Sequence, residues 1–273
     1  NSPYEPIRVM MPGRVADVDF GVTHACAVLE NADLYCWGDG YLGKVGHGSG
    51  SWGTEVVVPE LILSDVKQVS AGYDHTCAVL NDGRIACWGE GGLGRLGNAG
   101  TSDQHSPVFV DGTAWSPSRA TMVVAGKENS CALVDHELYC WGNDRKWGGH
   151  PSNGIQYDTP TLVDVGAGVI SVISISIGND ETCVLAHIAY VEGEASHPEV
   201  RCGGHDRLSE RGVSASNQCV PLFLPAWCRT TSTLDWFPSA GSHPTISFEA
   251  GRDGLGLSVE RGVVDEYTIL AGS

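Results

Sequence analysis

Positive charge is scarce in this sequence of 273 residues. It has 16 lysines and arginines against 33 aspartates and glutamates, and its formal net charge at pH 7 is −17. Such a polyanionic surface repels phosphate backbones and anionic lipid headgroups. We therefore expect no nucleic-acid partner. Two explanations of the charge stay open: solubility alone, or a surface that binds cations or basic partners.

Long apolar runs are also absent. No stretch reaches the ~20 apolar residues of a membrane helix, and the most apolar one, residues 165–178, is interrupted by serines and rich in β-branched residues, which favours a strand. We expect no membrane insertion. The sequence starts without methionine and shows no signal peptide, so we expect a processed chain or a piece of a precursor.

Spacings typical of catalysis or metal binding are missing. The sequence contains no C-x₂₋₄-C, H-x-x-x-H, H-E-x-x-H or G-x-S-x-G. Its glycine-rich runs are followed by strand patterns, whereas a phosphate loop needs a helix. We therefore predict a protein that is not an enzyme and has no catalytic residues, no cofactor and no metal site.

Glycine is abundant, with 36 residues, and it marks a repeat. "GVTHACAVLENADLYCWG" matches "GYDHTCAVLNDGRIACWG" and "GKENSCALVDHELYCWG", which begin at Gly21, Gly72 and Gly126. A stretched copy begins at Gly178 and an eroded one at Gly251. Short apolar strands such as "EVVVPEL", "SPVFV" and "TPTLVDV" precede the copies. The chain therefore consists of one unit repeated at intervals of about 50 residues.

Each unit has the pattern of four short strands with a glycine-rich exit. A period near 50 residues with four strands per unit is typical of a β-propeller blade. We predict an all-β, single-domain propeller of about five blades, at approximately 1–50, 51–102, 103–155, 156–216 and 217–273. In the second copy the hairpin turn requires a left-handed residue, which Gly83 provides. In the third, the turn is centred on Asp135 and His136.

The pattern G-x-x-H-[TA]-C-A-[VL]-L…C-W-G…L-G resembles the repeat of the regulator of chromosome condensation family, in the cysteine-paired form found in secreted or surface proteins. The resemblance covers essentially the whole chain and implies a β-propeller. Family propellers usually have seven blades, and five copies are present here. The ring is therefore five-bladed, or blades are missing from the chain, or a partner supplies them.

The ten cysteines fall into five pairs. Four pairs occupy the same two positions of successive copies, where directly opposed residues of antiparallel strands lie within reach of a disulfide. We predict disulfides in an oxidising compartment, outside the cell or at its surface. Zinc and reduced core cysteines are the alternatives. The predicted pairs are Cys26–Cys36, Cys77–Cys87, Cys131–Cys140, Cys183–Cys202 and, by elimination, Cys219–Cys228.

Two further repeat positions attract attention. His24 and His75 share one of them, and we expect them to cap the tight turn that leads into the strand. Trp37, Trp88 and Trp141 share the other. We expect these indoles to pack between blades, because large aromatic side chains dominate such interfaces.

Two irregular segments are candidates for a contact surface. The long hairpin tip at 186–200 contains Tyr190, and the insertion at 219–244 contains Trp227, Trp236 and Phe237. Exposed aromatics on a rigid scaffold favour binding, although loops folded over their own blade have the same composition. We predict an extracellular structural protein that assembles with itself or with neighbouring subunits. The alternative is a secreted binding or inhibitor module that recognises a protein or glycan through its propeller-face loops.

Overall fold

The computed structural model describes residues 8–49, 54–143, 156–178, 181–189, 196–204, 244–251, 254–261 and 270–271. These residues form β-strands joined by turns and three short 3₁₀ helices, so the chain is all-β as predicted. The helices are η1 (Tyr41–Gly43), η2 (Gly92–Gly94) and η3 (Gly112–Trp115). No helix in these ranges has the length and apolar character needed to cross a membrane.

Three antiparallel sheets of four strands form blades 1 to 3, each in the order of the sequence. Blade 1 contains β1 (Val15–Phe20), β2 (His24–Leu29), β3 (Leu34–Asp39) and β4 (Glu55–Leu63). Blade 2 contains β5 (Val66–Ala71), β6 (His75–Leu80), β7 (Ile85–Gly89) and β8 (Gln104–Phe109). Blade 3 contains β9 (Ala120–Ala125), β10 (Asn129–Val134), β11 (Glu137–Asn143) and β12 (Gln156–Leu162).

The two later sheets have three described strands each. Blade 4 contains β13 (Val169–Ile177), β14 (Glu181–Ile188) and β15 (His197–Gly204). In the fifth sheet, β16 (Pro244–Gly251) pairs antiparallel with β17 (Gly254–Arg261) and parallel with β18 (Leu270–Ala271). The predicted four-stranded blade is therefore found in full in the first three sheets.

The sheets end later than the approximate repeat boundaries. β4 pairs with β3 through Leu34 and Leu63, so "EVVVPEL" forms the outer strand of blade 1 rather than the first strand of blade 2. β8 and β12 likewise pair backward with β7 and β11. The repeat fixes the period, but it does not show which neighbour an apolar strand will pair with.

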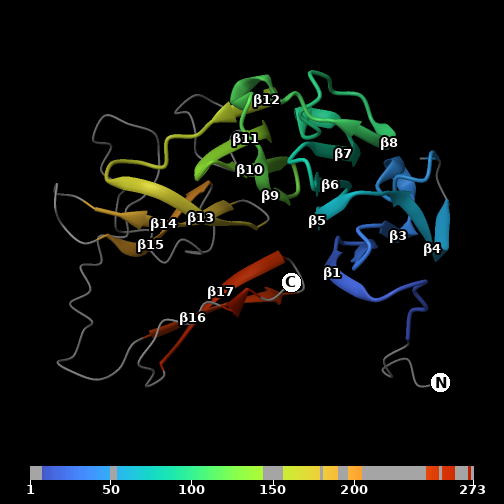
Figure 1. The fold of residues 1–273 in the computed structure, drawn as a ribbon, viewed down its shortest axis with the longest axis horizontal. Coiled ribbons are helices and arrows are strands. Elements are labelled where there is room, and N and C mark those ends of the chain that lie inside the picture. Colours follow the sequence, from blue (N-terminus) through green and yellow to red (C-terminus); the bar gives the residue numbers. More distant parts are fainter. Residues whose placement is uncertain are drawn as a thin grey trace.

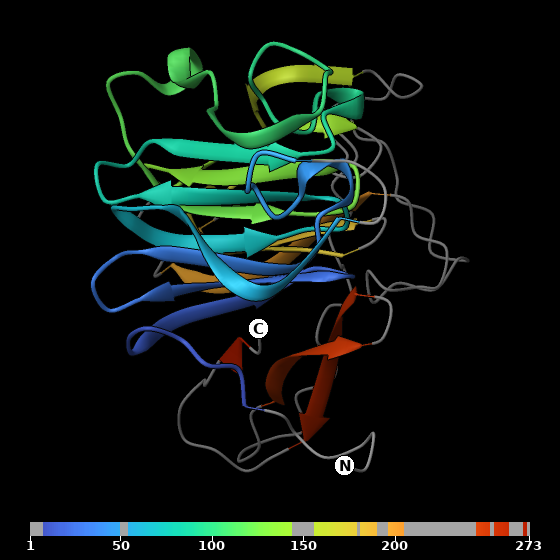
Figure 2. The same cartoon turned by 90° about the vertical axis from the view of Figure 1, so that its right-hand side faces the viewer.

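Blades 1 to 4 follow one another around an arc, with β1, β5, β9 and β13 toward the middle and β4, β8 and β12 outside (Figure 1). Seen from the side, the sheets are stacked face to face (Figure 2). Polar side chains join the inner strands. The Ala71 N–H donates to Asp19 Oδ2 over 2.8 Å, and Gln68 makes two hydrogen bonds to the backbone of Val123.

The hairpins have the predicted turns. Gly83 is left-handed, with φ of 80°, and its N–H donates to the Leu80 carbonyl. In blade 3, Asp135 and His136 have φ of 48° and 69°, as a two-residue turn of mirror-image type requires. The shorter cysteine spacing of blade 3 therefore reflects a shorter turn.

Candidate functional site: the joints between blades and the tight-turn face

Four predicted cysteine pairs are disulfides, at 26–36, 77–87, 131–140 and 183–202. In each pair the cysteines are directly opposed across the hairpin, and their Cα atoms lie 4.0–4.1 Å apart. Among the described residues no cysteine is free. The fifth predicted pair, Cys219–Cys228, lies outside the described residues.

The disulfides of blades 1 to 3 pack against the following blade. We call the interface between successive blades a joint, the side a blade turns to the previous blade its leading face, and the opposite side its trailing face. At the second joint, Cys77 and Cys87 share a core with Ala132 and Trp141 of blade 3. The first joint repeats this arrangement with Cys26, Cys36, Ala78 and Trp88. These disulfides therefore lie in the buried cores between blades, on the trailing faces.

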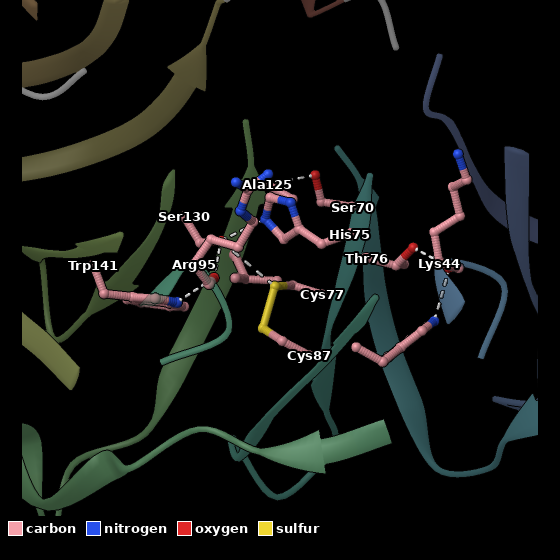
Figure 3. Close-up of a disulfide and its surroundings, with 12 residues drawn as sticks. Lys44, Ser70, His75, Thr76, Cys77, Cys87, Arg95, Ala125, Ser130 and Trp141 are labelled. Atoms are coloured by element: carbon pink, nitrogen blue, oxygen red, sulfur yellow. Dashed lines mark hydrogen bonds between the residues drawn. A yellow bond between two sulfur atoms is a disulfide. The ribbon is translucent and has the colours of Figure 1, made fainter. Parts of the chain in front are cut away.

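A backbone carbonyl in each exit loop fastens the joint. We call the glycine-rich segments 40–48 and 91–100 the exit loops of blades 1 and 2. The Arg95 carbonyl accepts from Trp141 Nε1 over 2.8 Å and from Ser130 Oγ over 2.9 Å (Figure 3). The Lys44 carbonyl accepts equivalent bonds from Trp88 Nε1 and Thr76 Oγ1. We call this carbonyl with its two donors the latch.

His24 and His75 complete the latches, which corrects their expected role as turn caps. His24 Nε2 lies 2.8 Å from Thr76 Oγ1, and His75 Nε2 lies 2.8 Å from Ser130 Oγ. Each hydroxyl donates its single proton to an exit-loop carbonyl, so it accepts from the imidazole, which carries its proton on Nε2. The side chain thus joins two blades.

Burial keeps both imidazoles neutral. Desolvation, followed by the charge of Lys44, lowers the pKa of His24 to about 3. Desolvation also lowers the pKa of His75 well below its ordinary value, and Arg95 adds to the effect. Neither Nδ1 atom has a hydrogen-bond partner. A proton added there would be a buried charge without a counterpart.

The basic side chains of the exit loops form ion pairs at the joints. Lys44 Nζ lies 2.9 Å from Asp39 of its own blade and 2.8 Å from Asp74 of the next. Burial opposes this charge, but the hydrogen bonds and charges of Asp74 and Asp39 outweigh burial and raise the pKa of Lys44. At the next joint, Arg95 pairs with Glu90 over 2.6 Å and donates to the Lys127 carbonyl.

Exposed apolar side chains gather where the inner strands turn into the second strands. Phe20 and Val22 are 61% and 60% exposed, and Tyr73 is 43% exposed. The turns touch through their backbones, since the Gly72 carbonyl lies against Gly21 and the Tyr73 N–H donates to Gly126. We call Phe20, Val22, Tyr73 and Lys127 the tight-turn face. Lys127 Nζ lies 5.4 Å from the Tyr73 ring centroid.

The other predicted site residues have mixed outcomes. Trp88 and Trp141 are fully buried between blades, as predicted, whereas Trp37 is half-buried. The proposed contact residues Tyr190, Trp227, Trp236 and Phe237 lie outside the described residues. No group of three or more metal-binding side chains occurs in the part of the chain that the structure describes.

The sequence analysis did not predict a role for the hydroxyls of Thr76 and Ser130. Their repeat position holds Ala25 in blade 1 and Thr182 in blade 4. The available signal was that each of these four copies has a small residue directly after the histidine position. It pointed to no partner, because the acceptor carbonyl belongs to another repeat.

The family model of the regulator of chromosome condensation (RCC1) repeat matches residues 31–79 and 82–133, and a second model of the same repeat matches 15–44 and 66–95. Residues 15–133 of this chain are therefore RCC1 repeats. Its repeats are 32% identical over 153 residues to the ultraviolet-B receptor UVR8 of Arabidopsis thaliana, covering 55% of this chain and 33% of that protein. They are 27% identical over 199 residues to the human E3 ubiquitin-protein ligase HERC2, covering 70% of this chain and 4% of that protein.

Solved structures show the same fold. Yeast RCC1 (Prp20), crystallised with Kap60, superimposes with a TM-score of 0.64 at 17% identity, covering 94% of this chain and 56% of that one. Human WBSCR16 gives a TM-score of 0.57 at 19% identity, covering 75% and 55%. This RCC1-repeat chain therefore spans less than two thirds of each of these relatives.

Proposed function

We propose that this protein is a non-enzymatic, disulfide-braced binding propeller that works outside the cell or at its surface and joins copies of itself or neighbouring subunits into a larger assembly. RCC1-repeat propellers are protein-binding modules. Yeast RCC1 (Prp20) has been crystallised with Kap60 bound to it, and the same protein binds Gsp1p and histones. A protein partner is therefore the class that the family supports.

The tight-turn face carries the proposal. Phe20, Val22 and Tyr73 are exposed on or beside two turns of neighbouring blades whose backbones touch. Exposed apolar side chains on neighbouring rigid turns favour a protein interface. Asp39 and Asp74 lie beside it, so a partner with apolar and basic side chains would fit.

The disulfides support the proposed location outside the cell or at its surface. Four pairs in strict register are kept where ordinary apolar residues would fill the core, and such bonds persist in oxidising surroundings. Thiol counting on the native protein tests this. We expect no reactive thiol before reduction and ten after it, and free thiols in freshly isolated protein would contradict the extracellular assignment.

Light scattering across a concentration series tests assembly. We expect a species larger than one chain, and the double variant Val22→Ser/Tyr73→Ser should shift it toward the monomer without changing the circular dichroism spectrum. Phe109→Ser is the matched control, because Phe109 is 51% exposed on the outer strand β8, away from the tight-turn face. A chain that remains monomeric at high concentration would leave the alternative, a module that binds another protein or a glycan.

A further inference from the structure

Polar side chains on the inner strands close the inner edge of the second joint. We call a side chain that binds the backbone of the next inner strand a clasp. Gln68 Oε1 accepts from the Val123 N–H over 2.9 Å, and Gln68 Nε2 donates to the Val123 carbonyl, also over 2.9 Å. Ser70 Oγ accepts from the Ala125 N–H over 3.1 Å. This joint therefore has two clasps, and both reach N–H groups at the edge of the following strand.

The first joint has clasps at the same two repeat positions. Asp17 Oδ2 accepts from the Val69 N–H over 3.4 Å, and Asp19 Oδ2 accepts from the Ala71 N–H over 2.8 Å. In both blades the clasps lie four and two residues before the glycine that opens the tight turn. The clasp is therefore a feature of the repeat rather than of one blade.

The third joint has apolar residues at both clasp positions. Met122 and Val124 stand four and two residues before the opening glycine of blade 3. The next inner strand keeps the register, because Ile175, like Val123, lies opposite the residue that follows the first cysteine of its blade. A valine side chain has no acceptor, and a thioether is only a weak one. The Ile175 N–H thus faces a position that supplies an amide oxygen one joint earlier.

Met122 lies where a small oxidant has access. Its side chain is half-buried and packs against the core of the third joint, which includes Ile175. A cavity of about 730 Å³ lies at the foot of the same joint, lined among others by Leu133 of blade 3 and Ser171 of blade 4. Leu133 is the cross-strand partner of Met122. Solvent in this cavity therefore comes close to the sulfur.

Methionine sulfoxide has nearly the shape of glutamine. The sulfur takes the place of the glutamine Cδ, the added oxygen that of Oε1, and the methyl group that of Nε2. Oxidation turns the apolar thioether into a polar group whose oxygen is a much better acceptor. A sulfoxide at position 122 would therefore reproduce the accepting half of the Gln68 clasp, but not its donating half.

We propose that Met122 is an oxidation-responsive clasp: a peroxide converts it to the sulfoxide, whose oxygen accepts from the Ile175 N–H and tightens the third joint. The thioether sulfur attacks one oxygen of hydrogen peroxide. The O–O bond breaks as the S–O bond forms. Sulfur loses two electrons, and the second oxygen leaves as water with both protons of the peroxide.

The expected effect has the opposite sign to ordinary methionine damage. A sulfoxide usually disrupts the core in which it forms. At Met122 it would stabilise the joint, because the backbone N–H of Ile175 is already placed by the register of β13. The clasp is independent of the proposed assembly, since Met122 lies on the inner strand β9 and self-association was assigned to the tight-turn face.

Hydrogen exchange of the Ile175 amide in the full chain measures the clasp. In a Met10→Leu/Met11→Leu background Met122 is the only methionine, so mass spectrometry after peroxide treatment should count one added oxygen. We expect the Ile175 amide to exchange about five-fold more slowly in the sulfoxide form, the effect of one hydrogen bond. The Ala125 amide, which is already clasped at the second joint, should keep its rate.

Two variants at position 122 make the test specific. Met122→Gln should slow exchange of the Ile175 amide without peroxide, at least as strongly as the sulfoxide, because its Nε2 also donates. Met122→Leu keeps an apolar side chain of similar volume, and its exchange should not respond to peroxide.

Three results would each overturn the proposal. The first is an Ile175 amide that exchanges at the same rate or faster after oxidation of Met122. The second is equal exchange in Met122→Gln and Met122→Leu. The third is a Met122 that stays reduced in the native chain when Met10, which is 69% exposed, is fully oxidised.

Discussion

His75 Nε2 donates to Ser130 Oγ over 2.8 Å, across the joint between blades 2 and 3. This hydrogen bond stabilises the joint only while the imidazole is neutral. A proton added at the buried Nδ1 atom would have no hydrogen-bond partner. His24 has the same relation to Thr76 one joint earlier. Two of the joints are therefore held by buried imidazoles whose pKa would be near 6.5 if they were exposed to water.

Acid should loosen these joints. A histidine whose folded pKa lies below its unfolded value contributes stability that is complete above pH 6.5 and is lost as the pH falls toward the folded pKa. With the pKa of His24 at about 3, the free energy of unfolding should drop by about 2 kcal/mol between pH 7 and pH 5 from this residue. Urea unfolding at each pH measures the drop.

Asparagine provides the control, because Asn129 holds the same position in blade 3 and donates Nδ2 to Thr182. His24→Asn and His75→Asn should each keep a hydrogen-bond donor at the joint. Each should also make the free energy of unfolding depend less on pH. An unchanged slope in the double variant would show that carboxylates, rather than these imidazoles, set the acid limit.

The indoles at equivalent positions should differ in their contribution to stability. Trp88→Phe removes the hydrogen bond to the Lys44 carbonyl from a fully buried joint and should cost about 1–3 kcal/mol of unfolding free energy. Trp37→Phe should cost less than about 0.5 kcal/mol, because its N–H has no acceptor among the described residues. Chemical denaturation of both variants measures the difference, and equal losses would contradict the latch.

The hairpin turns of blades 1 and 2 allow a matched exchange. Ala32 and Gly83 both accept left-handed geometry, with φ of 66° and 80°, and both donate their N–H to the residue three positions earlier. Ala32→Gly should stabilise the protein by about 0.5–1 kcal/mol, because a Cβ is unfavourable at positive φ. Gly83→Ala should destabilise it by more, since the new Cβ would also meet the Arg119 side chain. Thermal unfolding of the two variants checks both signs.

One disulfide should be reduced before the others. Cys183 is half-buried, whereas Cys26, Cys77 and Cys131 are completely buried in the joints. Access governs attack on a disulfide, so mild reductant should open Cys183–Cys202 first. Differential alkylation with mass spectrometry identifies the labelled cysteines, and earlier labelling of Cys77 or Cys87 would contradict the packing of the second joint.

The repeat made the local structure predictable. Cys77 and Cys87 recur at fixed positions around a turn that Gly83 completes, so strand register, disulfide pairing and turn type followed from spacing and backbone chemistry. The outer strand was assigned to the wrong neighbour. "EVVVPEL" lies between two hairpins in the sequence, and its pairing with β3 depends on the path of the exit loop.

The sequence by itself determined the hairpin of each repeat and the four disulfides across it, because the paired cysteines are only 9–19 residues apart and recur at fixed positions. Only the tertiary structure decided what the histidines, hydroxyls and indoles do. Their partners lie 32–55 residues away on a neighbouring blade, and the donors meet at a carbonyl of the exit loop. A repeat shows which positions recur, whereas stacking decides which of them meet.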